Sequence, residues 1–240
     1  MMNLSHAQID RLGDRLRQGS LTESDLRMLD EYRRSFGEAY ETVVRFLREG
    51  PKLEPTGRPA KSTGSLVEKL RRESIRLSQV QDIAGCRVVV ADIAEQEGIA
   101  VAVLFMWPGA SIIDRRADPS YGYRAVHVVS RISSKLVEIQ VRTVLQHLWA
   151  ELSEKLSDVV DPNIKYGDGP DAIRWLLATF SADIARLEEF ELMITGLLEQ
   201  HGSEQNLQEL RERVVHLKKE IADSLNRLIS GIGNPRRQEQ

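Results

Sequence analysis

Residues 137–143 read Val-Glu-Ile-Gln-Val-Arg-Thr, and this stretch predicts the centre of the fold. Apolar and polar residues alternate along it, which is the period of a strand whose side chains point to two faces in turn. One face is apolar and is expected to enter the core: Val137, Ile139 and Val141. The other face is polar: Glu138, Gln140 and Arg142. A carboxylate, an amide and a guanidinium in one row could bind a metal, a base edge and a phosphate, or could form an ordinary solvent-facing strand surface.

Further strands are predicted on both sides of this one. Residues 124–132 form a strong strand pattern, joined to a strand over 136–142 by Ser133-Ser134-Lys135, a loop length typical of a hairpin. Short β-branched runs at 86–90 and 111–113 predict two more strands.

Helical patterns surround the strands. Apolar residues at three- and four-residue steps predict helices within 3–50, over 65–77 and again from Thr143 onward, and residues 93–106 are expected to form a further helix. Within the first of these regions, Thr22 with Asp25 three residues later is typical of a helix start. The stretch from Pro51 to Pro59 is predicted to be a loop because it holds three prolines and Gly57.

The expected fold class is therefore α/β (α+β), with a mixed sheet of about five strands surrounded by helices. Residues 1–50 would form N-terminal helices, 51–165 the core, and 166–240 a C-terminal helical extension. In this extension, two helices separated at Gly202-Ser203 are expected to form an antiparallel hairpin, followed by a polar, frayed tail from Asn234 to Gln240.

Composition restricts the class of protein. The chain has 240 residues, with 33 Lys+Arg against 36 Asp+Glu, 41% hydrophobic and 29% charged residues, which excludes global disorder. No run approaches the roughly 20 apolar residues that a bilayer requires, so no membrane association is expected.

The single cysteine, Cys86, excludes a disulfide framework and lies in an apolar run, where a buried structural thiol is expected. The N-terminus has no apolar signal core, so the chain is expected to stay in a reducing cytoplasm.

The segment before the strand at 124–132 carries a possible stacking group. Gly122 permits a positive φ or a close backbone approach. Tyr123 then offers a flat ring with a polar tip, which is suited to stacking on a nucleobase. His127 follows in the strand and could serve the site or be an ordinary hydrogen-bonded histidine of the core or rim.

Upstream, Asp82 and Gly85 come just before the strand predicted at 86–90. A carboxylate at a strand edge is a common magnesium ligand, because Mg²⁺ takes one or two carboxylates together with phosphates and water. The alternative role for Asp82 is the N-cap of a turn.

The segment from Arg58 to Leu70 places cations and hydroxyls at the start of a helix. Helix N-termini favour anions through their free N–H groups and the macrodipole. Lys61, Ser65 and Lys69 recur at four-residue steps and could line one side, although the segment is not a Walker A loop and could be an ordinary capped basic helix.

Taken together and in this order, the motifs resemble the synthetase domain of the RelA/SpoT alarmone family over roughly residues 36–165. They are R-x-x-K-S-x-x-S-L-x-x-K-L from Arg58, D-I-A-G-x-R from Asp82, G-Y-R-A-V-H from Gly122, E-I-Q-V-R-T from Glu138 and L-Q-H-L-W-A-E-L from Leu145.

This resemblance implies an activity and a set of roles. The chain would transfer pyrophosphate from ATP to the ribose 3′-hydroxyl of GDP or GTP, with Mg²⁺ as cofactor. Asp82 and Glu138 would hold the metal and be catalytic. The ATP-binding residues would be Arg58, Lys61, Ser65 and Arg87. On the acceptor side, Tyr123 would stack on guanine, surrounded by His127, Gln140 and Arg142.

Two departures from the family pattern keep other functions open. Pro119 stands where relatives have a cation, and Arg58 and Lys61 are spaced by three residues instead of two. One alternative is a toxin-type relative that modifies the 3′ end of tRNA, although a net charge of −3 gives no global support for binding nucleic acid. The other is a catalytically degenerate nucleotide-binding or interaction module.

Two expectations concern what accompanies the synthetase-like region. No histidine is followed by aspartate, so hydrolysis of the product is not expected, and the chain would be a small, stand-alone synthetase. The C-terminal hairpin could support a homo-oligomer or pack on its own core.

Overall fold

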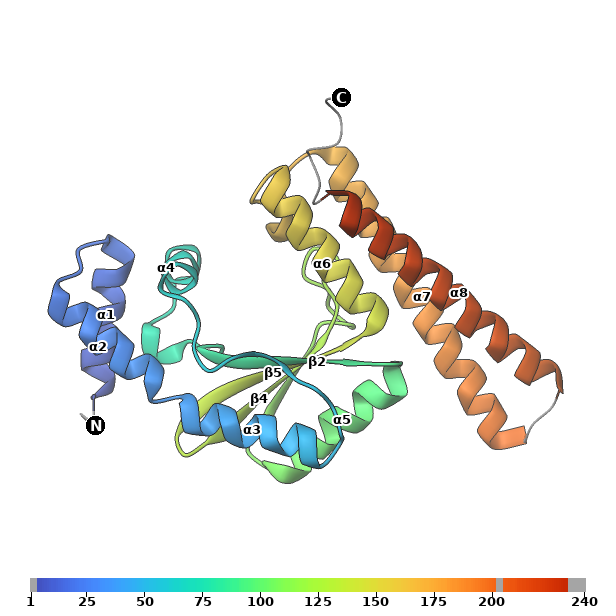
Figure 1. Ribbon diagram of the computed structural model, residues 1–240, viewed down its shortest axis with the longest axis horizontal. Coiled ribbons are helices and arrows are strands. Elements are labelled where there is room, and N and C mark those ends of the chain that lie inside the picture. The colour runs from blue at the N-terminus through green and yellow to red at the C-terminus, as the bar shows by residue number, and fades with distance from the viewer. Residues whose placement is uncertain (1–3, 202–204, 233–240) are drawn as a thin grey trace. The chain divides into compact units, whose positions relative to one another are not determined.

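The computed structural model describes residues 4–201 and 205–232. Five strands form one mixed sheet in the order β1-β2-β5-β4-β3, so the expected α+β class is confirmed. The strands are β1 (Thr56–Arg58), β2 (Ala84–Val90), β3 (Ser111–Asp114), β4 (Val126–Ile132) and β5 (Lys135–Thr143). The helices are α1 (His6–Gln18), α2 (Glu23–Arg34), α3 (Gly37–Glu49), α4 (Thr63–Arg72), α5 (Ile93–Met106), α6 (Val144–Val159), α7 (Asp171–His201) and α8 (Gln205–Ile232), with short 3₁₀ turns at Leu77–Gln79 and Ile164–Tyr166 (Figure 1).

The chain divides into two compact units. The first unit comprises Met1–Val88, Val101–Ile112 and His127–Gln140. The second unit comprises Val89–Ala100, Ile113–Val126 and Val141–Gln240.

The helical region predicted over 3–50 consists of three helices. The start predicted at Thr22 is confirmed, because the Thr22 hydroxyl accepts a hydrogen bond from the Asp25 N–H and the Asp25 carboxylate accepts one from the Thr22 N–H. Such a reciprocal cap satisfies two N–H groups that the helix itself leaves unpaired.

The prediction of a loop from Pro51 to Pro59 was wrong in part, because this stretch contains β1. This strand pairs antiparallel with β2, and its partners are Thr56 with Arg87, Gly57 with Cys86 and Arg58 with Gly85. A three-residue strand has no periodicity of its own, so its pairing partner defines it.

Two other boundaries differ from the prediction. Helix α4 begins at Thr63 because the Ser62 hydroxyl caps it by accepting a hydrogen bond from the Ser65 N–H, and it ends at Arg72, before an extended Glu73. Strand β4 begins at Val126, so the predicted strand residue Arg124 lies in the loop before it.

Gly57 has no room for a side chain. A Cβ at this position would lie 2.4 Å from the Gly85 carbonyl oxygen and 2.6 Å from the Cys86 Cα. Both atoms belong to the backbone of β2, so a rotamer change cannot remove the clash.

We expect Gly57→Ala to force β1 away from β2 and to lower the free energy of unfolding by about 1–3 kcal/mol, a typical cost of overpacking. Chemical denaturation measures this loss. Gly64→Ala in α4 is the control, because nothing lies within 4 Å of a Cβ there. Equal stability of the two variants would contradict the tight pairing.

Strand β5 has the predicted alternation. Val137, Ile139 and Val141 are fully buried, whereas Glu138 and Gln140 between them are partly exposed. The hairpin from β4 turns on Ser133 and Ser134, which have φ values of 47° and 68°. Two successive residues of positive φ match the twist of a two-residue hairpin turn.

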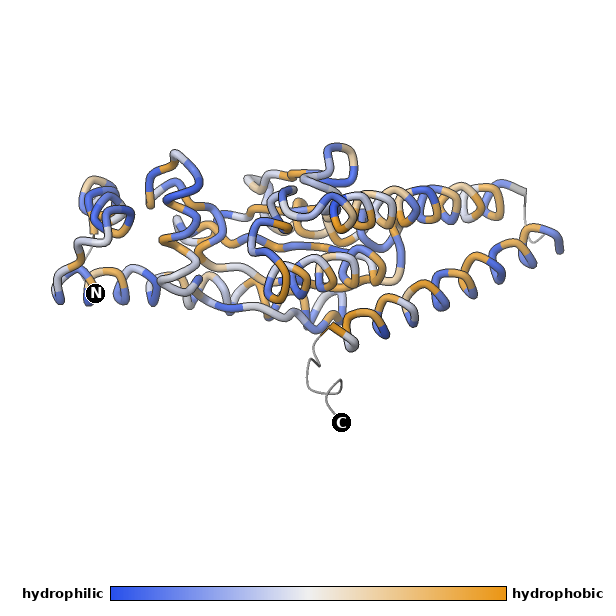
Figure 2. Tube along the Cα trace, turned by 90° about the horizontal axis from the view of Figure 1, so that it is seen from above, coloured by the Kyte–Doolittle hydropathy of each residue, from blue (hydrophilic) through white to orange (hydrophobic). Residues whose placement is uncertain are grey.

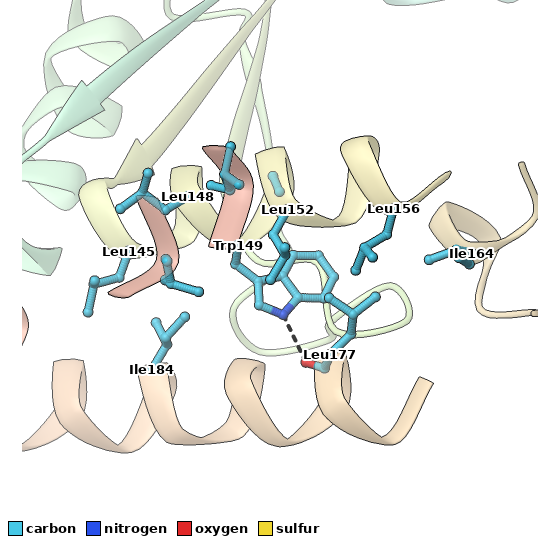
Figure 3. Packing of buried hydrophobic residues seen from close by; sticks show 11 residues of the cluster. Leu145, Leu148, Trp149, Leu152, Leu156, Ile164, Leu177 and Ile184 are labelled. Atoms are coloured by element: carbon cyan, nitrogen blue, oxygen red, sulfur yellow. Dashed lines mark hydrogen bonds between the residues drawn. The ribbon is translucent and has the colours of Figure 1, made fainter. Parts of the chain in front are cut away.

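The core of the second unit forms where α6, α7 and α8 pack on one another. Its residues on α6 include Leu145, Leu148, Trp149 and Leu152, and the Trp149 Nε1–H donates to the Leu177 carbonyl of α7 at 2.8 Å (Figure 3). Helices α7 and α8 run antiparallel, as expected (Figure 1), and hydrophobic and hydrophilic residues alternate along both (Figure 2). The predicted break at Gly202-Ser203 and the predicted tail from Asn234 lie outside the described residues. Among the described helices, none is both long enough and apolar enough to span a bilayer.

Candidate active site

A pocket of about 310 Å³ opens in the first unit, where β1, β2 and β5 lie next to one another. Its lining residues are Thr56, Gly57, Arg58, Lys61, Asp82, Gly85, Cys86, Arg87, Glu138 and Gln140. Six of the ten predicted site residues are among them, although they come from three separate segments of the chain. Strand pairing therefore assembles most of the predicted site.

Asp82 is neutralised by two lysines. The Lys61 ammonium pairs with one carboxylate oxygen, and the Lys69 ammonium donates to the other at 2.9 Å. Burial opposes ionisation of Asp82, but the two cations outweigh it and hold its pKa below the ordinary value. Asp82 is therefore charged at neutral pH. Its carboxylate pairs with two lysines instead of capping a turn.

Glu138 is fixed through both of its carboxylate oxygens. His127 Nδ1 lies 2.8 Å from Oε1, and the Gln140 side-chain amide donates to Oε2 at 2.8 Å. Burial raises the pKa of Glu138, but the hydrogen bonds from His127 and Gln140 outweigh this effect, so the net pKa is lowered. The result is an ionised carboxylate with a defined orientation, supported by the predicted residues His127 and Gln140.

Three cations also line the pocket. Arg58 on β1 and Arg87 on β2 join Lys61 there. Arg87 Nε is buried and has no hydrogen-bond partner among the described residues. A buried guanidinium donor without a partner is costly, which favours an anionic ligand at this wall.

Gly85 and Cys86 of β2 also line the pocket. A Cβ at Gly85 would lie 3.2 Å from the Glu138 carbonyl oxygen, so β2 and β5 approach closely here. Cys86 is buried, and burial raises the pKa of its thiol to about 12. A thiol with this pKa is no nucleophile at neutral pH, which agrees with the predicted structural role.

The predicted ligands Asp82 and Glu138 suit a divalent cation. Both line the pocket, and the negative charge of Asp82 raises the pKa of Glu138, so a cation placed there would relieve their repulsion. Among residues 4–201 and 205–232, no group of three or more His, Cys, Asp or Glu side chains could hold a metal. Two carboxylates still fit Mg²⁺, which completes its shell with water and substrate phosphates.

Three predicted residues lie elsewhere. Ser65 is in the first turn of α4, where its hydroxyl accepts a hydrogen bond from Ser62 at 2.8 Å. Tyr123 and Arg142 belong to the second unit and contact each other: the Arg142 guanidinium donates to the Tyr123 hydroxyl at 3.0 Å and its carbon lies 5.0 Å from the ring centroid. Arg142 is only 4% exposed, so it is a buried partner of Tyr123 and not part of an open strand face.

Some contributors to the site were missed by sequence reasoning. Lys69 was seen only as one of three residues at four-residue steps, and its contact with Asp82 was not foreseen. The available signal was the four-residue step from Ser65 to Lys69, which places both on one side of α4, whereas Lys61 precedes this helix. Ser181 on α7, which contacts the loop before β4, had no such signal, since it lies 57 residues from its partner Arg124.

Comparisons with known proteins give a consistent picture. A family model described as a region found in RelA / SpoT proteins matches residues 57–157, which include all ten predicted site residues. An uncharacterised protein of Mycobacterium tuberculosis is 43% identical over 119 residues, covering 48% of this chain. The chain spans less than half of that relative, 43% of its length.

A protein and a crystal structure from Bacillus subtilis are also similar. The GTP pyrophosphokinase YjbM is 32% identical over 157 residues, covering 59% of this chain and 71% of that protein. The crystal structure of small alarmone synthetase 1 bound to its product pppGpp is 27% identical with a TM-score of 0.54, covering 74% of this chain and 100% of that one.

Proposed function

The chain belongs to the RelA/SpoT family, and we propose that it is a pyrophosphokinase that transfers pyrophosphate from ATP to the ribose 3′-hydroxyl of GDP or GTP. The observation that carries this proposal is the charge pattern of the pocket. Three cations, Arg58, Lys61 and Arg87, and two carboxylates, Asp82 and Glu138, line it together. Phosphoryl-type transfer depends on this combination, because it needs positioning and neutralisation of charge more than covalent catalysis.

In this reaction the 3′-oxygen of the acceptor attacks the β-phosphorus of ATP. The bond from that phosphorus to the oxygen bridging the α- and β-phosphates breaks, and AMP leaves. The hydroxyl proton must go to a base. Glu138 fits this role, since it is ionised and its two oxygens are oriented by His127 and Gln140.

The cationic wall would bind the donor. Arg58 and Arg87 would pair with ATP phosphates, and the unpartnered Nε of Arg87 supplies a donor for them. Lys61 pairs with Asp82 and could reach either that carboxylate or a phosphate. Ser65 lies in the first turn of α4, where the helix dipole favours an anion.

Asp82 and Glu138 would hold Mg²⁺. The bound ion would supply positive charge to the phosphate oxygens as the pyrophosphoryl group is transferred. The two lysines beside Asp82 keep this carboxylate ionised, and they would have to release its oxygens for the ion to bind.

Tyr123 would stack on the guanine of the acceptor. Arg142 would orient the tyrosine ring through its contacts with the hydroxyl and the ring. We expect Tyr123→Phe to keep most of the acceptor affinity, because the ring remains. Tyr123→Ala should lose about 1–3 kcal/mol of acceptor binding, a typical stacking contribution. Titration of each variant with GDP measures the difference.

The phenylalanine variant also removes the oxygen that accepts from Arg142, so its thermal stability should fall slightly. Equal loss of acceptor affinity in both variants would assign the effect to the hydroxyl and contradict stacking.

The function is tested by incubating the protein with ATP labelled in the β-phosphate and, separately, with GDP, GTP or tRNA. The proposal expects label in a guanosine product and release of AMP, dependent on Mg²⁺. Label transferred only to tRNA would overturn the guanine-nucleotide acceptor. The absence of transfer to any of the three would overturn the enzymatic function.

A further inference from the structure

Helix α7 holds the loop that carries Tyr123. The Ser181 hydroxyl donates to the Gly122 carbonyl at 2.6 Å and accepts from Arg124 Nε at 3.1 Å. Ser181 is 4% exposed, so water does not compete effectively for these bonds. One buried hydroxyl therefore forms hydrogen bonds with the residues on both sides of Tyr123.

The loop has a conformation that needs such support. The backbones of Ser120 and Tyr123 exchange two hydrogen bonds, at 3.3 and 3.0 Å, and Gly122 between them has a φ of 91°. A Cβ at Gly122 would lie 2.8 Å from the Trp149 ring and 3.3 Å from the Ser181 Cβ. The loop is thus closely packed between α6 and α7.

Arg124 extends this support toward the start of the loop. Its Nη1 donates to the Arg116 carbonyl at 2.6 Å, while its Nε donates to Ser181. The guanidinium therefore connects two segments of the loop to α7. Its Nε and Nη1 are both used in hydrogen bonds within the protein.

The position of Ser181 is itself defined by two anchors on the same face of α7. Four residues before it, the Leu177 carbonyl accepts from the Trp149 indole at 2.8 Å (Figure 3). Seven residues after it, the buried Glu188 carboxylate accepts from the Thr143 hydroxyl and from the Gln146 amide, the latter at 2.9 Å. Spacings of four and seven residues keep these groups on one helix face.

We propose that Ser181 is a positioning residue for the acceptor: α7 keeps Tyr123 in place through Ser181, so this helix takes part in acceptor recognition without touching the reacting groups. This inference rests on the proposed function for its substrate. It assigns a role to a helix that begins at Asp171, beyond the residues 57–157 that the family model matches.

The test combines two measurements on Ser181→Ala in the full chain. Hydrogen exchange of the segment 115–125 reports the loop without any substrate, and steady-state kinetics report KM for GDP and for ATP. We expect faster exchange in this segment, a KM for GDP raised about tenfold, as for the loss of one buried hydrogen bond, and an unchanged KM for ATP.

Ser224→Ala is the matched control. The Ser224 hydroxyl on α8 donates to the Glu220 carbonyl of its own helix at 2.8 Å, so its removal should leave both measurements unchanged. A double variant of Ser181→Ala with Arg124→Ala should be less damaging than the sum of the two single variants, because the two residues share one hydrogen bond.

The outcomes separate this inference from the proposed function. Unchanged exchange at 115–125 overturns the role of Ser181, whatever the activity. Faster exchange with an unchanged KM for GDP, or with an equal rise in both KM values, overturns its link to the acceptor. An inactive wild-type protein overturns the proposed function and the acceptor role with it, while the exchange measurement still decides whether Ser181 holds the loop.

Discussion

Glu138→Gln is expected to lower kcat by more than about 100-fold, a typical cost of removing a group that acts on the charge developing in a transition state. The amide has the size of the carboxylate but can neither accept the 3′-hydroxyl proton nor share a cation with Asp82. Its oxygen and nitrogen can still meet His127 and Gln140, because the side-chain amide of Gln140 can turn to match. The folded structure should therefore persist, and thermal unfolding checks this.

Glu154→Gln is the control for Glu138. It makes the same chemical change on an exposed position of α6 and should leave kcat unchanged. Turnover of Glu138→Gln near that of the control would remove Glu138 from the mechanism. A large drop in melting temperature would instead assign the loss of activity to the fold.

Asp82→Asn is expected to have the second largest effect, again a loss of more than about 100-fold in turnover if this carboxylate holds the metal. The substitution leaves the ammonium groups of Lys61 and Lys69 beside a neutral amide, so two cations repel the ion that the site would bind. The Mg²⁺ concentration for half-maximal activity should therefore rise in the variant. A titration of activity with Mg²⁺ measures this change directly.

Asp171→Asn is the matched control for Asp82. The Asp171 side chain is 98% exposed at the first turn of α7 and pairs only weakly with Arg174, at 3.1 Å. If Asp82→Asn kept both the turnover and the Mg²⁺ requirement of this control, Asp82 would be a structural partner of the two lysines alone.

The candidate site was predictable from the sequence as far as strand period allowed. The alternation over 137–143 placed Glu138 and Gln140 on one face of a strand, and the structure has both on the pocket. The motif order then suggested that Asp82, Lys61 and Arg87 belong with them, and strand pairing brings them there. By its spacing Arg142 should share the strand face of Glu138 and Gln140. It is buried against Tyr123 instead, because β5 ends there at the packed start of α6.

The sequence by itself determined the features that depend on short-range order. The alternation of β5, the cap at Thr22 and the spacing of apolar residues in the C-terminal helices depend on residues a few positions apart, so their patterns are visible along the chain. Tertiary structure alone decided that Gly57 lies in a strand, that Lys69 neutralises Asp82 and that Ser181 holds the loop of Tyr123. These features join residues separated by 13 to 59 positions or depend on a partner strand, and only packing brings such groups within hydrogen-bond distance. No local pattern records a contact whose free energy comes from burial between distant segments.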